Sequence, residues 1–306
     1  MDNFSTDIDT DTVLGTTTSR ENLEGQLITE ALNYQLDGIN IDIESLPEET
    51  SESYVQFMRE LSVKCRNNNL VLSVDVPSPY SFNEHYSQKE LGEVVDYVII
   101  MGYDEHYVGS DAGSVASLSY ERDGITGTLE NVPKEKIISG IPFYTRLWKT
   151  NASGEVSSEA IGMDKADQIL SDYKVTAGWS SETSQDYAEF TDEDGNFCQI
   201  WLENEASIEE KMKLVQEYGL AGVAEWKLGF ERSSIWDVIA KYVNYIMILL
   251  QSQVWLRGGN IAKNKKKYLP VLQKYDKIKN CEWLQTSSHF ETLNSLLTKV
   301  IVGQRP

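Results

Sequence analysis

The sequence of 306 residues is long enough for one large domain or two ordinary ones. Hydrophobic residues make up 41% of it and charged residues 25%, which is typical of a globular protein and excludes a largely disordered chain. The net charge is −21, but basic residues dominate after about residue 240 and acidic residues dominate before it. Because an acidic body repels phosphates, we expect no nucleic-acid partner for residues 1–240.

Cysteine and histidine, three of each, are too few and too scattered for a metal centre or a disulfide framework. No metal or organic cofactor is therefore expected. The first residues, M-D-N-F-S-T-D, lack the basic and apolar parts of a signal peptide. The longest apolar run, near residues 245–250, is far shorter than the ~20 residues that a membrane span needs. The sequence predicts neither a signal peptide nor a membrane span.

Helical and strand patterns alternate in the first hundred residues. Thr18 and Glu21 form a predicted capping box at the start of a helix, and apolar spacing over residues 54–61 predicts a second helix. Helical spacing is weak over residues 91–95. Strands are predicted at residues 36–43, 70–76 and 97–101. The third of these is a continuous apolar run, which is typical of a parallel strand buried on both faces.

The same alternation continues in the second part of the chain. Strands are predicted at residues 137–143 and 222–226, and helices at residues 165–173, at 207–218 and from Ser234 to about Trp255. Short alternating pieces around a predicted hairpin turn at Asp194-Gly195 indicate a small α+β insertion at about residues 148–204. Trp201 and Glu203 are expected to serve its packing and its surface. The pattern predicts an α/β fold with a parallel sheet.

The segment D-G-I-N-I-D-I-E, residues 37–44, carries the strongest indication of chemistry. In a strand, Asn40, Asp42 and Glu44 share one face, and the three isoleucines between them share the other. Polar groups on an interior face are costly unless they bind each other or a ligand. Two neighbouring carboxylates also raise the pKa of one of them toward the range of a general acid. The alternative is an edge strand with a solvated polar face.

This segment resembles the D-x-x-D-x-D-x-E signature on the fourth strand of the family 18 glycoside hydrolases. Asp37, Asp42 and Glu44 match it, whereas Asn40 stands in the place of the middle aspartate. Three more motifs resemble those of the family's strands six, seven and eight, in the right order: M-G-Y-D, G-I-P-F-Y-T-R and G-V-A-E-W. The pieces N-I-D-I-E, I-W-L-E-N and W-K-L-G-F-E are most similar to the bacterial spore-cortex and peptidoglycan branch.

The resemblance implies a TIM-type (β/α)8 barrel over residues 1–243 that contains the insertion. Only Met1 to Ser5 remain for the end of strand three. We therefore expect a barrel that lacks its first strands and exposes two sheet edges. Residues 244–306 form a basic tail outside the resemblance. Its cluster Lys263 to Lys267 is either a binding site for anionic cell wall or nucleic acid, or a solvated segment.

The resemblance also implies a mechanism. Glu44 would protonate the glycosidic oxygen while the 2-acetamido carbonyl of the sugar attacks its own anomeric carbon. Asp42 would hold the acetamido N–H, and Tyr103 would donate a hydrogen bond to the acetamido oxygen. The remaining residues expected to bind substrate are Asp37, Asn40, Asp104, Tyr144, Arg146 and Trp226. Trp226 would lie under the sugar ring, and Asn40 removes one charge from the relay behind Asp42.

The expected function is hydrolysis of β-1,4-linked N-acetylglucosamine polymers, with peptidoglycan or spore cortex as the first choice and chitin as the second. The implied location is extracellular, at the cell wall or on the spore. Two alternatives are a lectin-like protein, which the retention of Glu44 disfavours, and an inactive truncated remnant. Three site residues also have simpler interpretations: Trp226 as a core residue, Tyr103 as a buried tyrosine, and Arg146 as a partner of a surface carboxylate.

Overall fold

The computed structural model describes residues 1–3, 9–242, 247–249 and 299–302. Its main sheet has seven strands in the order β1-β2-β3-β4-β10-β12-β11. The first five are parallel, and β12 and β11 are antiparallel additions. The parallel strands are β1 (Gly38–Ile41), β2 (Val71–Pro77), β3 (Tyr97–Met101), β4 (Ile137–Pro142) and β10 (Gly222–Trp226). The α/β fold and all five predicted strands are confirmed, with ends that shift by a few residues.

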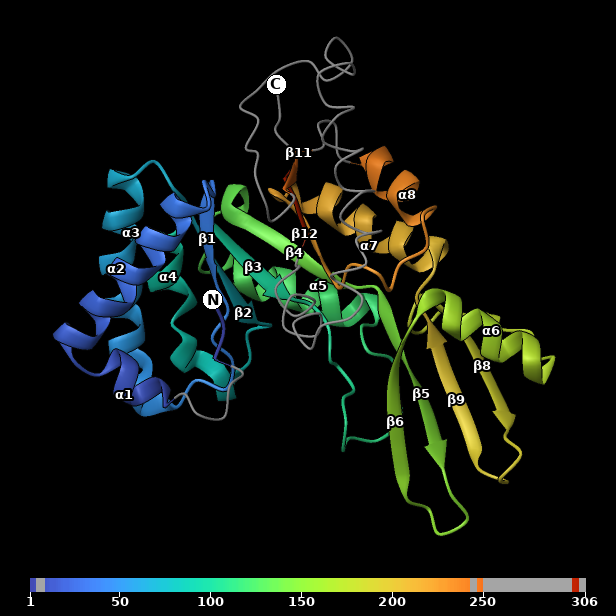
Figure 1. The fold of residues 1–306 in the computed structure, drawn as a ribbon. Helices are drawn as coiled ribbons and strands as arrows, with labels where there is room; N and C mark the ends of the chain where they lie inside the picture. The colour runs from blue at the N-terminus through green and yellow to red at the C-terminus, as the bar shows by residue number, and fades with distance from the viewer. Residues whose placement is uncertain (4–8, 243–246, 250–298, 303–306) are drawn as a thin grey trace.

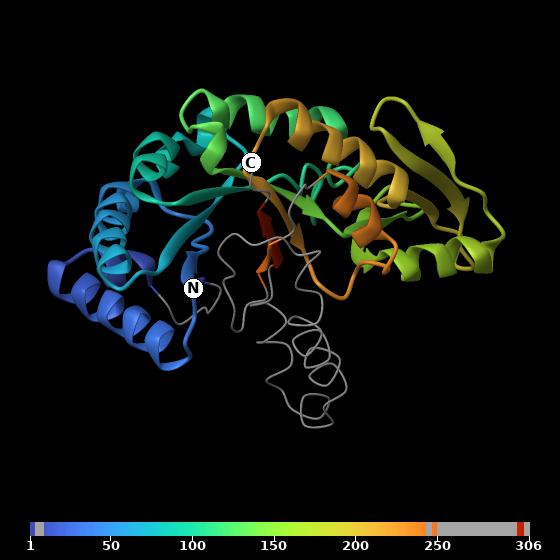
Figure 2. The ribbon, with the colours of Figure 1, turned by 90° about the horizontal axis from the view of Figure 1, so that it is seen from above.

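Helices cover the convex side of this curled sheet, so that the described residues form a half-barrel (Figure 2). The helices are α1 (Thr10–Leu14), α2 (Thr17–Asn33), α3 (Ser51–Asn67), α4 (Gln88–Val94), α5 (Leu118–Leu129), α7 (Glu205–Tyr218) and α8 (Ile235–Tyr242). Short 3-10 turns lie at Glu48–Thr50, Ser81–Tyr86 and Lys134–Lys136. None of the helices in the described residues is long and apolar enough to cross a bilayer.

The core lies between the sheet and these helices. On α3 a fully buried apolar stripe recurs every three or four residues, at Tyr54, Phe57, Met58, Leu61 and Cys65. It belongs to the same cluster as the side chains of Ile41 and Ile43. The isoleucines of residues 37–44 therefore face the helices, and the polar residues of the same segment face the inner side of the half-barrel.

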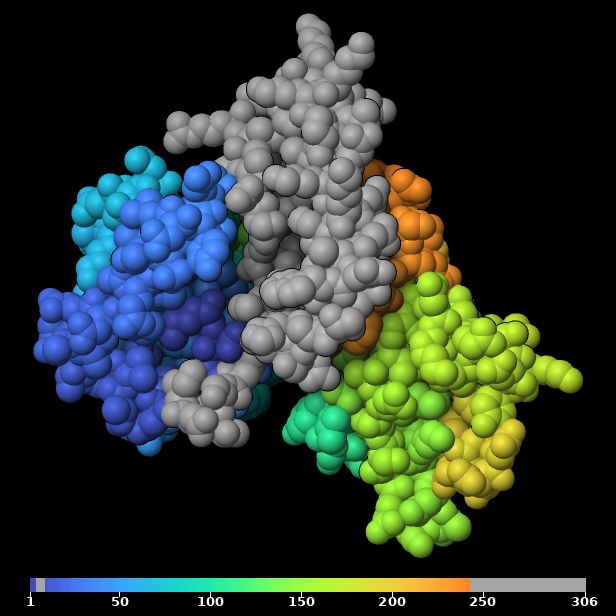
Figure 3. Space-filling view, in the orientation of Figure 1, coloured from blue at the N-terminus to red at the C-terminus, as the bar shows by residue number. Residues whose placement is uncertain are grey.

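A second sheet projects from the body as a separate lobe, seen at the lower right of Figures 1 and 3. It is antiparallel, with the order β6-β5-β9-β8-β7, and α6 (Met163–Tyr173) packs on it. Its strands are β5 (Tyr144–Thr150), β6 (Val156–Gly162), β7 (Gly178–Ser180), β8 (Gln185–Thr191) and β9 (Phe197–Leu202). The predicted hairpin turn joins β8 to β9, and Gly195 takes a φ of +83° there. The α+β insertion is confirmed, but it begins at Tyr144, four residues before its expected start.

The edges of the parallel part are covered in part, which differs from the expectation of two exposed edges. Beside β1, Met1 accepts a backbone hydrogen bond from Asp42 at 2.7 Å, and Asp2 forms a parallel bridge with Asp42. Beside β10 lies β12 (Lys299–Val302), which pairs in turn with β11 (Met247–Leu249). Extended backbone therefore satisfies hydrogen-bonding groups that an open sheet would expose.

Two sequence predictions about helix ends were wrong. The first long helix is capped by Thr16, whose side chain forms a capping box with Ser19, in place of the predicted pair Thr18 and Glu21. The last helix ends at Tyr242 and does not reach Trp255, since residues 247–249 form strand β11. The basic cluster at residues 263–267 lies outside the described residues, so its role stays a prediction.

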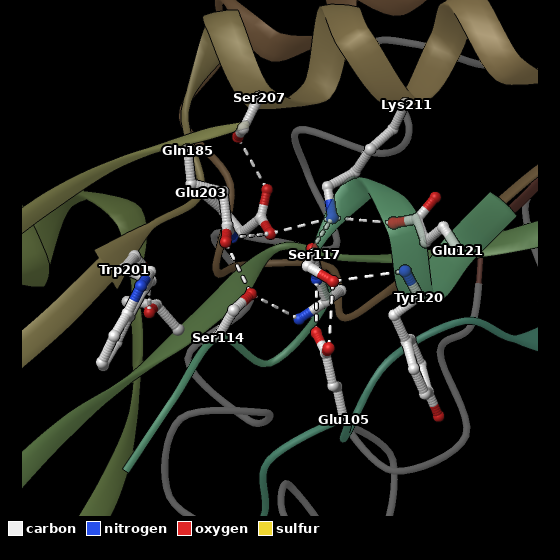
Figure 4. Close-up of polar contacts among 12 residues, drawn as sticks. Glu105, Ser114, Ser117, Tyr120, Glu121, Gln185, Trp201, Glu203, Ser207 and Lys211 are labelled. Atoms are coloured by element: carbon white, nitrogen blue, oxygen red, sulfur yellow. Dashed lines mark hydrogen bonds and ion pairs between the residues drawn. The ribbon is translucent and has the colours of Figure 1, made fainter. Parts of the chain in front are cut away.

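A buried ion network joins the two sheets through α7 (Figure 4). The ammonium group of Lys211 lies 2.8 Å from a carboxylate oxygen of Glu121 on α5 and 3.1 Å from one of Glu203 at the end of β9. Gln185 of β8 and Ser207 of α7 each donate a hydrogen bond of 2.7 Å to Glu203. Glu203 therefore does serve packing, as expected, but it is buried and contributes nothing to the surface.

Candidate active site

Most of the predicted site residues meet at one end of the half-barrel. Carboxyl ends of parallel strands lie at the same edge of a sheet, and in barrels this edge carries the site. Asp42 and Glu44 directly follow β1, and Tyr103 and Asp104 directly follow β3. Further members are contributed by β5, with Tyr144 and Arg146, and by the last residue of β10, Trp226.

The side chains of Asn40, Asp42 and Glu44 form a polar row along one face of the segment, and residues of β2 hold this row in place. The Asn40 side-chain amide donates to Asp75 at 2.6 Å, and the hydroxyl of Ser73 donates to the Asn40 carbonyl oxygen at 2.7 Å. Both partners lie on β2, so the row points toward the inner face next to that strand. β1 does lie at the edge of the sheet, but these contacts show that its polar face is hydrogen-bonded at Asn40 and not simply solvated.

Asp75 is a site residue that the sequence analysis missed. Its side chain is buried, with an exposed fraction of 5%, inside the strand sequence V-L-S-V-D-V-P. The alternation of Ser73 and Asp75 with valines places two polar side chains on one face of an otherwise apolar strand. The segment around Glu44 has the same pattern of polar side chains on one face of an apolar strand. The pattern in β2 could therefore have identified Asp75 from the sequence.

The carboxyl groups of Asp42 and Glu44 hold protons more tightly than ordinary carboxyl groups. Burial, with the charges of Asp42, Asp104 and Asp2 acting in the same direction, raises the pKa of Glu44 to about 7. Burial also raises the pKa of Asp42 to about 6, although the nearby N-terminal ammonium of Met1 opposes the shift. At neutral pH a large share of Glu44 is therefore protonated and able to donate.

These raised pKa values make stability depend on pH. The folded protein binds the protons more tightly than the unfolded chain, so the contribution is complete below about pH 4 and is lost as the pH rises through about 7. We expect Glu44 to lower the free energy of unfolding between pH 5 and pH 8 by an amount on the order of 1 kcal/mol, after allowance for solvent screening.

Urea unfolding of the unmodified chain and of Glu44→Gln at pH 5 and pH 8 measures this contribution. Between pH 5 and pH 8, the free energy of unfolding of Glu44→Gln should fall by less than that of the unmodified chain. Glu52→Gln, on an exposed position of α3, is the matched control and should behave like the unmodified chain. The same pH dependence in all three proteins would contradict the shift of Glu44.

Three aromatic rings lie against one another beside these carboxyl groups. The Trp226 ring centroid is 5.0 Å from that of Tyr144 and 6.4 Å from that of Tyr103. Burial raises the pKa of Tyr103 well above its usual value, and the charges of Asp75, Asp42 and other carboxylates add to this. Its hydroxyl therefore stays a hydrogen-bond donor. Trp226 is half-buried and not a core residue, so part of its ring is available to a ligand.

Asp104 connects the loop after β3 to the second sheet. The Tyr144 hydroxyl donates to its carboxylate at 2.5 Å, and a guanidinium nitrogen of Arg146 lies 3.6 Å from the same oxygen. Arg146 is buried and also donates to Ser158 at 3.3 Å, whereas the Asp104 side chain is exposed, so the simpler interpretation of Arg146 as the partner of a surface carboxylate also fits this contact. One side of the site is therefore lined by Asp104, which follows a strand of the main sheet, and by Tyr144 and Arg146, which belong to the second sheet.

Asp37 is the predicted site residue that the structure does not bring to this end. It precedes β1, and its carbonyl oxygen accepts a backbone hydrogen bond of 2.9 Å from Val71 at the start of β2. Seven residues of extended chain separate it from Glu44, roughly 20 Å along the strand. The structure therefore places Asp37 away from the end of the sheet where the other site residues gather, and its role in substrate binding stays a prediction.

The half-barrel with acidic and aromatic residues at the carboxyl edge of its parallel sheet has the architecture of a TIM-type barrel protein. Residues 4–231 match the model of Glycosyl hydrolases family 18, and the chain belongs to this family. The spore-cortex resemblance is confirmed by two relatives. YdhD of Bacillus subtilis (strain 168), named as a sporulation-specific glycosylase, is 30% identical over 74% of this chain and 54% of its own length. The cortical fragment-lytic enzyme of Bacillus anthracis is 25% identical over 78% of this chain and 57% of its own length.

Solved structures agree with this assignment. The crystal structure of YdhD superposes with a TM-score of 0.69 at 27% identity, covering 72% of this chain and 77% of that chain. A chitinase from Chromobacterium violaceum ATCC 12472 gives a TM-score of 0.72 at 25% identity, covering 79% and 77%. The present chain spans little more than half the length of YdhD and of the cortical fragment-lytic enzyme.

Proposed function

We propose that this protein cleaves β-1,4-linked N-acetylglucosamine polymers with retention of configuration, with Glu44 as the general acid. The observation that carries the proposal is the Glu44 carboxyl, which follows β1 at the carboxyl edge of the sheet and whose pKa burial raises to about 7. A carboxyl group with such a pKa is protonated when the reaction begins and can release its proton to a leaving group near neutral pH.

Substrate assistance supplies the nucleophile in this mechanism. The acetamido carbonyl oxygen attacks the anomeric carbon of its own sugar as Glu44 protonates the departing oxygen, which gives a cyclic oxazolinium ion. Glu44, now a carboxylate, then takes a proton from the water that opens this ion. Asp42 accepts the acetamido N–H and stabilises the positive charge, and Tyr103 donates to the acetamido oxygen.

The other site residues hold the sugar in place. Trp226 offers a partly accessible aromatic face on which a pyranose ring can stack. Tyr144 and Arg146 lie on the side of the site toward the second sheet, where both contact Asp104. These contacts hold the loop after β3, and with it Tyr103, against the second sheet. The geometry favours a substrate with a 2-acetamido group at the sugar next to the cleaved bond.

Peptidoglycan of the spore cortex is the first choice of substrate, and chitin is the second. The names of YdhD and of the cortical fragment-lytic enzymes support the first, and di-N-acetylchitobiase of Mus musculus, 25% identical over 68% of this chain, supports the second. Either polymer lies outside the cytoplasm, so we infer an extracellular, cell-wall or spore-associated site of action.

Release of reducing ends tests the proposal. We expect the chain to release them from cortex peptidoglycan or from chitin oligomers but not from a β-1,4-glucan, which has the same linkage and lacks the acetamido group. The expected difference is at least about 10⁴-fold, since the glucan offers no internal nucleophile and water alone must replace it. Comparable cleavage of the glucan would refute substrate assistance. Soluble, cooperatively unfolding protein that cleaves none of the polymers would favour the alternative of an inactive protein.

A further inference from the structure

The strand next to the catalytic segment contributes a buried carboxyl group to the site. Asp75 accepts the Asn40 amide through one oxygen, and its other oxygen is buried without a hydrogen-bond partner. One oxygen of Asp42 is likewise buried without a partner. Unsatisfied buried oxygens are rare in folded proteins, and two in one site require an explanation.

Strand register places the two aspartates side by side. Gly38 to Ile41 of β1 pair in order with Val71 to Val74 of β2, and the next step of this register pairs Asp42 with Asp75. Neighbouring strands lie about 4.8 Å apart, and paired residues project to the same face. Two carboxyl groups at this spacing in a buried site do not both carry a charge, because the repulsion adds to the cost of burial.

The groups around this pair agree with one shared proton. Burial, followed by the charge of Asp42, raises the pKa of Asp75 well above its usual value, whereas the Asn40 amide opposes the shift. The N-terminal ammonium of Met1 favours the charged form of both aspartates. Other titratable groups that interact with the pair are Asp2 beside β1, Glu44 at its end, Tyr54 from α3, Tyr86 before α4 and Tyr103 after β3.

The side-chain amide of Asn40 is oriented so that it donates a hydrogen bond to Asp75. The hydroxyl of Ser73 donates to its carbonyl oxygen, which turns the amide nitrogen toward Asp75. An aspartate at position 40 would offer an acceptor to an acceptor and would add a third buried carboxyl to the pair. A carboxyl on β2 and an amide on β1 thus form a complementary pair.

We propose that Asp75 is a positioning residue of the active site, which shares one proton with Asp42 and supplies from β2 the carboxyl group that Asn40 does not carry. With one proton between them, Asp42 keeps its side chain aligned toward the acetamido group and carries part of a negative charge when positive charge develops on the sugar. The inference rests on the proposed function for its effect on turnover, but the shared proton is independent of it.

Carboxyl ¹³C NMR titration of the folded protein tests the shared proton directly, with the Asp75 resonance assigned by its loss in Asp75→Asn. In Asp42→Asn we expect Asp75 to titrate at a lower pH, by about one unit, because the neighbouring carboxylate that opposes its ionisation is gone. Asp96→Asn is the matched control. This aspartate also bonds β2, through the Leu72 amide at 2.8 Å, but at the far end of the strand. An Asp75 titration that is unchanged in Asp42→Asn overturns the proposal.

Kinetics on N-acetylglucosamine oligomers gives the second readout. Asp75→Asn should lower kcat by roughly tenfold to 100-fold with KM within about twofold, and Asn40→Asp alone should also lower it. The exchange variant Asn40→Asp with Asp75→Asn restores one amide and one carboxyl and should recover most of the loss. Failure to recover, with both single variants folded, argues against a shared role. If no protein turns over substrate, the proposed function fails, while the titration still decides whether the proton is shared.

Discussion

Replacement of Glu44 by glutamine is expected to lower kcat by about 10²- to 10⁴-fold and to leave binding of N-acetylglucosamine oligomers within about threefold. Glutamine has nearly the same shape but no acidic proton to give to the leaving oxygen. The backbone at this position is held independently of the side chain, since Asn3 donates to the Glu44 carbonyl oxygen and accepts from its amide, both at 2.9 Å. Loss of turnover would therefore report lost chemistry and not lost structure.

Initial rates of reducing-end release, together with calorimetric binding to an oligomer, measure the two quantities separately. Glu52→Gln on the exposed side of α3 serves as the control and should keep both. Turnover that is unchanged in Glu44→Gln would show that another group donates the proton. Loss of binding together with turnover would show that Glu44 holds the sugar, as in a lectin-like protein.

The fold could be predicted where a single segment determines its own burial. The apolar run Tyr97 to Met101 lies in the middle of a parallel sheet, and its composition predicts a strand buried on both faces. The stripe on α3 likewise gives the face of the helix that packs. Helix ends were less predictable. Thr16 and Thr18 both suit an N-cap, and only the direction of the preceding chain selects Thr16.

The candidate site could be predicted where the role of a residue follows from its own strand. It could not be predicted where the role depends on a contact between two strands. Asp42 and Glu44 follow one strand and Tyr103 another, so the carboxyl-edge rule brings them together without a structure. The pattern of β2 marks Asp75 as a polar residue in an apolar strand, but its contact with the amide of Asn40, 35 residues away, could not be predicted. Asp37 was included because it matches a motif, and the structure places it at the other end of β1 from Asp42 and Glu44.

The ion network around Lys211 could not be predicted from the sequence. Its members lie in α5, β8, α7 and the residue after β9. Helical spacing places Lys211, unlike Lys213, on the buried face of α7 with Ile208 and Val215, but no local pattern identifies its carboxylate partners. Yet Lys211 is fully buried between two carboxylates, whereas Lys213 has an exposed pair with Glu210. Burial lowers the pKa of the Lys211 ammonium, but the charges of Glu121 and Glu203 reverse this and raise it.

Lys211→Met is expected to lower the free energy of unfolding by about 3–5 kcal/mol at pH 8, because it leaves two buried carboxyl groups without their cation. Burial already raises the pKa of Glu121 to about 7 with the lysine present, so protons can neutralise both groups as the pH falls. The loss should therefore shrink at pH 5.

Urea unfolding at both pH values measures the effect, and Lys213→Met, which breaks only the exposed pair, should change stability by less than about 0.5 kcal/mol. Because the network ties α7 to the second sheet and to the helix that follows the Tyr103 loop, the loss should also appear in catalysis before global unfolding, as a lower kcat at temperatures where the fold is intact. A Lys211→Met protein as stable as Lys213→Met at pH 8 would contradict this prediction, because it would show that Glu121 and Glu203 stay buried without their cation at no cost in stability.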